Sequence, residues 1–312
     1  MLTNLMTVSQ QVIILFLLIG VGVICGKIRL LSELSVKEVT NFVLYIVTPC
    51  IMIQTFQRPF DAALAGLFLQ AVLFAVITTV AAWLLARFTL HSPDSRRQNV
   101  YRFAAIFSNC GFMALPLENA LLGSDGLFFG AAYLATLNVF AWTMGIQIMS
   151  GSPKPPSLKK ILLNPCVIGV FVGLALFFSS ITLPQLIETP GEYLAALNTP
   201  LPMIVIGYHL SKADLTSILR DLRAWLAMTE RLILIPLIGL AIGLAMHMDT
   251  MAFIACMVGL CAPTGAICTM FSVTHGQDTE LSVSLVSVST LLSILTMPLI
   301  IVLAQTLVGF SG

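Results

Sequence analysis

Charged residues are scarce throughout this sequence. Only 9% of its 312 residues are Asp, Glu, Lys or Arg, whereas a soluble domain carries about 25%. The hydrophobic share is 58% and the mean hydropathy is +1.00, so we expect an all-α integral membrane protein whose outer surface contacts the lipid bilayer. The net charge of +1 leaves no basic excess that would favour binding to nucleic acid.

Signatures of catalysis and of metal binding are also missing. The seven cysteines fall inside apolar stretches and form no CxxC pair, so neither a disulfide framework nor a zinc site is predicted. No HExxH motif, Ser/His pair or paired aspartates lie at the predicted membrane depth, and we therefore expect neither an enzyme nor a bound cofactor. The first apolar run, from Val8, has no basic residue before it and is interpreted as a retained span.

Long apolar runs are abundant, and ten of them reach the length of about 20 residues that crosses a bilayer as a helix. They predict spans at 8–26, 38–57, 62–87, 98–122, 126–149, 161–182, 192–211, 224–246, 250–273 and 281–309. Every Lys and Arg except Arg58 falls on one side of this alternation. By the positive-inside rule we predict a multi-pass protein of the plasma membrane (the bacterial inner membrane) with both termini outside, in the periplasm.

Glycine, proline and aspartate residues of the first half of the chain recur in the second half at a constant offset of 153 residues. This offset pairs Gly20 with Gly173, Pro49 with Pro202, Gly123 with Gly276, and Asp125 with Asp278. Five spans per copy is an odd number, so the second copy enters the membrane from the opposite side. We predict an inverted 5 + 5 repeat made of residues 1–150 and 161–312, joined by a cytoplasmic linker at 151–160.

The fourth and ninth spans contain prolines that are expected to interrupt their helices. Pro116 and Pro263 remove a backbone donor and clash with the preceding turn. Freed backbone groups are tolerated at membrane depth only against protein or a water-filled cavity. Interrupted helices in corresponding positions of two repeats point to a substrate site where they cross. The positive ends of the half-helices would suit an anion.

The candidate substrate-binding residues surround these interruptions. The Asn109 amide can donate to a carboxylate without adding charge, although membrane Asn residues also join helices, and Pro116 and Pro263 could be ordinary kinks. The full set is Ser108, Asn109, Cys110, Pro116, Asn138, Pro263, Thr264 and Thr269.

Other polar residues within or beside the spans have several interpretations. Glu118 could bind a proton or a coupling cation, could be neutral and hydrogen-bonded, or could lie near the outer surface. Asp125 and Asp278 are expected to cap the helices that follow them. Glu230 and Arg231 are expected near a cytoplasmic helix end, as an ion pair or with extended side chains that reach the interface.

Five segments resemble the auxin efflux carrier family, which comprises the plant PIN proteins and bacterial malonate-type permease relatives: SNCGFMALPLENALLG, NPCVIGVFVGLAL, PLPMIVIGYHL, APTGAICTMFSVTHGQD and STLLSILTMP. The resemblance implies secondary transport of an organic anion, usually a carboxylate, and crossing helices 4 and 9. It also implies distant kinship with sodium/bile-acid symporters. The long cytosolic loop of the plant members is absent here.

The sequence therefore predicts a carrier of a small organic anion that works by alternating access. Spans 1, 2, 6 and 7 would form a scaffold, and the remaining spans would move against it as an elevator. A sodium-coupled symporter, with Glu118 and Thr269 beside the cation, is an alternative. An ion channel or a receptor on a transporter scaffold is another. Substrate identity, direction, proton or sodium coupling and assembly as a homodimer are left open.

Overall fold

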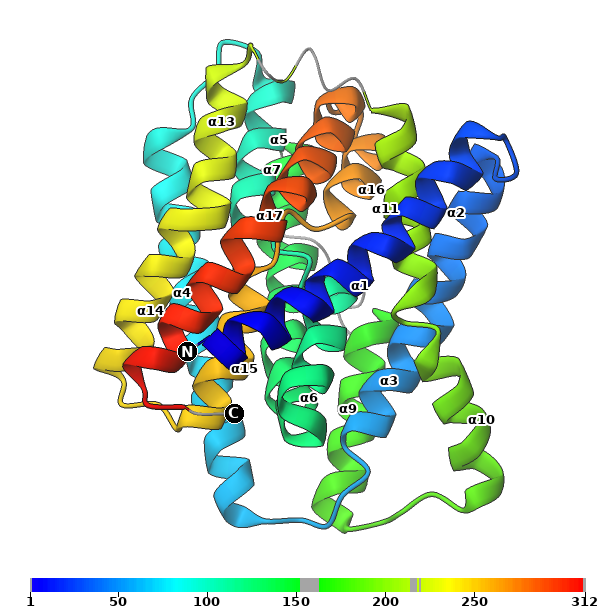
Figure 1. Ribbon diagram of the computed structural model, residues 1–312, viewed down its shortest axis with the longest axis vertical. Helices are drawn as coiled ribbons and strands as arrows, with labels where there is room; N and C mark the ends of the chain where they lie inside the picture. The colour runs from blue at the N-terminus through cyan, green and yellow to red at the C-terminus, as the bar shows by residue number, and fades with distance from the viewer. Residues whose placement is uncertain (1, 152–162, 214–217, 219, 311–312) are drawn as a thin grey trace.

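Helices make up nearly the whole of the computed structural model, which describes residues 2–151, 163–213, 218 and 220–310 (Figure 1). Helix accounts for 83% of these described residues, which contain no strand beyond one isolated bridge. The all-helical membrane class predicted from composition is thereby confirmed. The predicted linker at 151–160 lies, apart from Gly151, outside the described residues.

The first half of the chain contains both α-helices and short π-helices, the latter labelled η. In order they are α1 (Leu2–Lys27), α2 (Glu33–Phe42), η1 (Val43–Val47), α3 (Thr48–Thr55), α4 (Ala62–Thr89), α5 (Ser95–Ile106), η2 (Cys110–Ala114), α6 (Leu115–Phe140), η3 (Ala141–Gly145) and α7 (Ile146–Ser150). The second half contains α9 (Pro165–Ser179), α10 (Gln185–Ala196), α11 (Pro200–Lys212), α13 (Leu222–Thr229), η4 (Glu230–Leu234), α14 (Ile235–Ala245), α15 (Thr250–Cys261), α16 (Ile267–Thr274) and α17 (Thr279–Leu307).

Six helical stretches of the described chain are long and apolar enough to cross a membrane: Ser9–Lys27, Glu33–Thr55, Ala62–Thr89, Cys110–Ser150, Leu222–Ala245 and Thr279–Leu307. The predicted spans at 98–122 and 250–273 are interrupted and so give shorter pieces. The predicted spans at 161–182 and 192–211 correspond to the shorter helices α9 and α11. The ten-span inverted repeat stays a prediction.

Glycine sets the turn at corresponding points of the two halves. Gly123 and Gly276, which the offset of 153 pairs, both have a φ of +64°, a left-handed conformation that costs other residues strain. Gly123 interrupts α6 with a non-helical φ/ψ, while Gly276 precedes α17. Asp278 then caps α17 by accepting from the Leu281 N–H, as predicted. Asp125 pairs with Arg58 at 2.7 Å, and its capping role stays a prediction.

Close helix packing joins α1 to α11 and α3 to α9. A side chain at Gly22 would overlap the backbone of Ile204, and a Cβ at Gly169 would lie 2.8 Å from the Cα of Pro49. Small residues let helix backbones approach in membranes, where no hydrophobic effect drives helices together. The four helices therefore form two tightly packed pairs.

The turns that carry basic residues gather at one end of the molecule. In Figure 1 the α1–α2 and α4–α5 turns lie at the upper end, whereas the α3–α4 and α9–α10 turns lie at the lower end. Lys27 and Arg87 end helices at the upper turns, while Arg58 belongs to the lower α3–α4 turn. This arrangement agrees with the charge alternation in the sequence. Which end faces the cytoplasm stays a prediction.

Candidate functional site

Two non-helical segments cross in the middle of the protein. Helix α5 ends at Ile106 and α15 ends at Cys261, and helical structure resumes at Cys110 and Ile267. Between them, Ser108 and Thr264 form an antiparallel bridge. The Asn109 N–H donates to the Pro263 carbonyl at 2.7 Å, and the Gly265 N–H donates to the Phe107 carbonyl at 2.9 Å. The two interruptions therefore satisfy each other's backbone groups, as hydrocarbon surroundings require.

The first interruption does not lie at Pro116. That residue is in the first turn of α6, and the chain from Cys110 to Leu122 is helical, first as η2 and then as α6. The π-helix η2 directly precedes the turn that holds Pro116, so the regular helical hydrogen bonds are already shifted at the point where proline lacks its N–H. The predicted break at Pro116 is wrong, and the helix is broken at 107–109 instead. Pro263 does lie in a non-helical segment, at 262–266.

A cavity of about 100 Å³ lies beside the crossing. One wall contains the first residues of both resumed helices, including Cys110 and Ile267. The remaining lining comes from η1, from α6 and η3, and from the start of α9, and its residues include Thr48, Leu137, Asn138, Trp142, Asn164 and Cys166. The first N–H groups of a helix lack helical acceptors and carry about +0.5 of an elementary charge. Two helix starts on one cavity favour an anionic occupant.

Asn109 is the polar side chain best placed to meet that occupant. It lines the cavity, is only 4% exposed, and its Nδ2 has no hydrogen-bond partner in the structure. A buried donor without an acceptor costs about 1–3 kcal/mol, which a ligand that accepts from Nδ2 would recover. The structure therefore leaves an uncharged donor free at the helix starts.

Three other predicted residues also line the cavity, namely Ser108, Cys110 and Asn138. The Ser108 hydroxyl donates to the Gly259 carbonyl at 2.9 Å, which fixes the crossing. Asn138, in α6, donates a hydrogen bond from Nδ2 to the Leu134 carbonyl at 3.0 Å. Ser108 and Asn138 thus each donate a hydrogen bond to a protein partner, whereas the Asn109 side chain donates none.

The remaining predicted residues lie outside the cavity lining. Thr264 is buried and donates its hydroxyl to the Ala104 carbonyl at 3.0 Å, which links the crossing to α5. The Thr269 hydroxyl lies 3.5 Å from that of Ser282 in α17. Pro116 and Pro263 do not line the cavity either. Thr264 therefore supports the crossing from behind.

Glu118 is enclosed by protein. Its side chain is 1% exposed and packs against Gly130, where an added Cβ would overlap its carboxylate. Its Oε2 has no hydrogen-bond partner in the structure, and the residue does not line the cavity. The side chain is therefore not solvated at an outer surface. Binding of a proton or cation by Glu118 stays a prediction.

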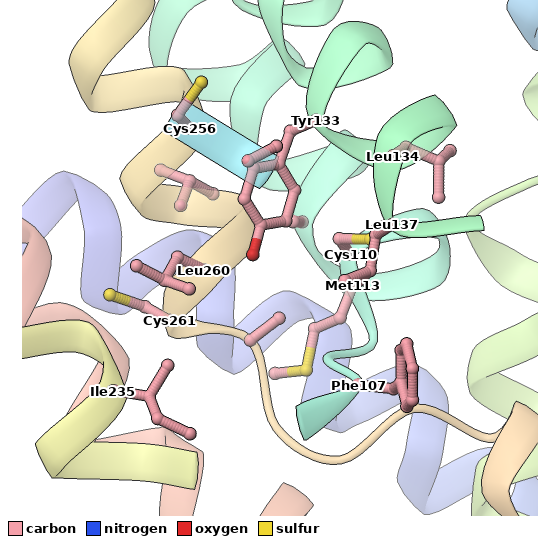
Figure 2. Packing of buried hydrophobic residues seen from close by; sticks show 14 of the residues in the cluster. Phe107, Cys110, Met113, Tyr133, Leu134, Leu137, Ile235, Cys256, Leu260 and Cys261 are labelled. Carbon is pink, nitrogen blue, oxygen red and sulfur yellow. The ribbon is translucent and has the colours of Figure 1, made fainter. Parts of the chain in front are cut away.

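Arg231 is a central residue that the sequence interpretation misplaced. It is 0% exposed, and its guanidinium donates to the carbonyls of Ala105 at 3.2 Å and Ile106 at 2.8 Å, and also to that of Leu260. Figure 2 shows the apolar packing around these helix ends, with Leu260 and Cys261 from α15, Ile235 from α14, and Cys110 and Met113 from η2. The expected ion pair or interfacial position of Arg231 is wrong. The available signal was a single arginine well inside an apolar run.

Asn164 is a second residue that the sequence interpretation missed. It lines the cavity and caps α9, because its Oδ1 accepts from the N–H groups of Cys166 at 2.9 Å and Val167 at 3.2 Å. The signal was the Asn-Pro pair before an apolar run, since Asn is favoured at the N-cap and Pro at the first helical position. The start of α9 therefore faces the cavity with a fixed geometry.

A polar network ties three helices together at the upper end in Figure 1. Arg97 of α5 pairs with Asp221 at 2.6 Å and Asp278 at 3.4 Å, the caps of α13 and α17. Burial alone raises the pKa of Asp221, but hydrogen bonds from Tyr101, from the Ala224 N–H and from Arg97 outweigh burial and hold that pKa below its usual value. The ionised Asp221 carboxylate therefore stabilises this end.

Residues 7–158 and 152–301 each match the family model described as membrane transport protein. The chain belongs to the auxin efflux carrier family. It is similar to an uncharacterized transporter of Methanothermobacter thermautotrophicus, with 23% identity over 93% of this chain and 96% of that protein. It is also similar to an uncharacterized transporter of Methanocaldococcus jannaschii, with 26% identity over 64% of this chain and 68% of that protein. Membership of this family makes the chain a multi-pass membrane transporter.

Proposed function

We propose that this transporter moves a small organic anion, a carboxylate, across the plasma membrane by alternating access. The observation that carries the proposal is the unpaired Asn109 amide in a cavity that two helix starts border. A carboxylate accepts from such donors, and its charge is favourable at helix N-termini. The cavity volume of about 100 Å³ is small compared with the pockets of drug-sized ligands, so the substrate has few heavy atoms.

The proposed architecture has ten spans in an inverted repeat of residues 1–150 and 161–312. The six long stretches would supply part of these spans. Helices α9 and α11, and the helices interrupted at the crossing, would supply the others. Two observations support the repeat. Gly123 and Gly276 share their backbone conformation, and span 1 packs on span 7 as span 2 packs on span 6.

The composition of the cavity wall supports alternating access. Part of the lining comes from η1 and α9, which belong to the proposed scaffold, and part comes from the crossing and from α6 and η3, which belong to the proposed moving group. Asn198, which precedes α11, donates to the Gly111 carbonyl at 3.1 Å across this boundary. Movement of the crossing would break that hydrogen bond and carry the substrate between the two facing states.

Counterflow in proteoliposomes tests the proposal. Protein reconstituted with an internal unlabelled carboxylate should take up the same labelled compound saturably, for at least one member of a panel of short mono- and dicarboxylates. Asn109→Ala should raise the half-saturating concentration about 10-fold or more, because a hydrogen bond to a charged group contributes about 1.5–3 kcal/mol. Asn41→Ala, at an exposed position of α2, is the matched control and should leave uptake unchanged.

Two results would count against the proposal. Uptake that rises linearly with concentration and needs no internal substrate indicates a channel. Saturable carboxylate uptake with equal half-saturation in wild type and Asn109→Ala would place the substrate elsewhere.

A further inference from the structure

The buried Arg231 guanidinium joins the carboxyl-terminal ends of both interrupted helices. Ala105 and Ile106 are the last two residues of α5, and Leu260 is in the last turn of α15. All three carbonyls accept hydrogen bonds from Arg231. The last four carbonyls of a helix have no helical donor, so the guanidinium satisfies groups that the interruptions leave open.

The charges at this point are close to balance. Each helix carboxyl end carries about −0.5 of an elementary charge, so two ends together offset about one positive charge. Arginine is always protonated in proteins. No described carboxylate lies within ion-pair distance of Arg231, so the helix ends are its counter-charge.

The crossing therefore has two sides of opposite polarity. The amino ends of the resumed helices border the cavity, whereas the carboxyl ends of α5 and α15 meet Arg231. In transporters with interrupted helices, carbonyls freed at half-helix carboxyl ends are ligands for a coupling sodium ion or proton. Here a covalently attached cation already occupies those carbonyls.

We propose that Arg231 is the fixed cation of the crossing, and that it takes the place of a coupling sodium ion. This inference rests on the proposed function, because it concerns how the same anion site is held. With the helix ends neutralised permanently, the crossing keeps its shape without a dissolved cation, and anion transport does not depend on a sodium gradient. Arg231 is a positioning residue, since it does not line the cavity.

The test compares wild type with Arg231→Ala in sodium, potassium and choline buffers. Wild-type uptake rates should agree within twofold across the three salts, and wild-type Tm values should agree within about a degree. Arg231→Ala should have a lower Tm in choline, and millimolar methylguanidinium or sodium should restore part of the loss by occupying the vacated carbonyls. Arg96→Ala removes the same charge from an exposed side chain and should show no such rescue.

Arg231→Lys is a second variant, for the case that the alanine variant does not fold. Lysine retains the charge but offers no planar fork, so this variant should be less stable than wild type and should still transport without sodium. A wild-type protein whose uptake or Tm requires sodium would overturn the inference, as would an Arg231→Ala protein that neither cation stabilises. The Tm measurements need no substrate, so a failure to transport carboxylates would overturn the proposed function while leaving the cation rescue intact.

Discussion

At the scale of single residues, two of the buried polar atoms without partners belong to candidate site residues, Nδ2 of Asn109 and Oε2 of Glu118. Such groups are rare in folded proteins and call for an explanation. That Asn109 lies beside a helix interruption could be predicted, because Asn and Gly residues are concentrated in that span. The position of Arg231 could not be predicted, because the charge alternation placed it near a cytoplasmic helix end, and only the tertiary fold reveals the carbonyls that it meets.

Gly130→Ala should destabilise the protein, because a Cβ at that position would overlap the Glu118 carboxylate. Overpacking of this kind costs about 1–3 kcal/mol. Thermal unfolding in detergent should therefore show a Tm several degrees below wild type. Gly20→Ala is the matched control, since a Cβ there meets nothing within 4 Å. Equal Tm values for the two variants would contradict the packing of Glu118 against Gly130.

At the scale of elements, the crossing shows what local sequence can and cannot predict. Interruption of the fourth and ninth spans was predictable, because Asn, Gly and Pro residues are concentrated in them. The position of the first break was not. Residues 107–109 leave the helix where they hydrogen-bond with 263–265, a tertiary contact that no local pattern encodes. Pro116, the strongest local signal, is accommodated within a helix.

The network at the ends of α5, α13 and α17 predicts a pH-dependent stability. The pKa of Asp221 is lowered in the folded protein, so its contribution is present above its unfolded pKa of about 3.9 and is lost as the pH falls through the folded value. Asp221→Asn should lower the free energy of unfolding at pH 7 by about 1–3 kcal/mol. The difference from wild type should shrink as the pH falls below about 4.

Asp94→Asn is the control for that measurement. Asp94 also caps a helix, but its contact with Arg96 is long, at 3.8 Å, and exposed. Asparagine retains the cap, so this variant should match wild type at both pH values. An Asp221→Asn deficit that stays constant between pH 7 and pH 3 would mean that the carboxylate charge is not what stabilises the network.

At the scale of the whole molecule, composition alone predicted the all-helical membrane class, because a chain with so few charges cannot form a solvated surface. The span count is harder to predict. Interrupted helices give pieces that are too short to span alone. Residues 110–150, in contrast, form one apolar stretch by length and composition, although the turn at Gly123 divides it. The predicted orientation depends on basic residues such as Lys27 and Arg87 at the upper end in Figure 1, whereas Arg58 lies in the lower α3–α4 turn and Arg231 is buried at the crossing.

Cysteine labelling tests that orientation. With Cys25 and Cys50, the two incompletely buried cysteines, replaced by alanine, Thr182→Cys between α9 and α10 should react with a membrane-impermeant maleimide in intact cells. Ser95→Cys, at the start of α5, should react only after the membrane is permeabilised. Both positions are exposed and lie at opposite ends of the molecule in Figure 1. The reverse pattern would contradict the proposed orientation.

The most direct test of the central claim is an experimental structure with a transported carboxylate bound. We expect the carboxylate to accept a hydrogen bond from Asn109 Nδ2 and to lie between the helix starts at Cys110 and Ile267. Arg231 should still be bound to the carbonyls of α5 and α15. A carboxylate bound away from the crossing, or a sodium ion on those carbonyls with Arg231 displaced, would contradict the claim.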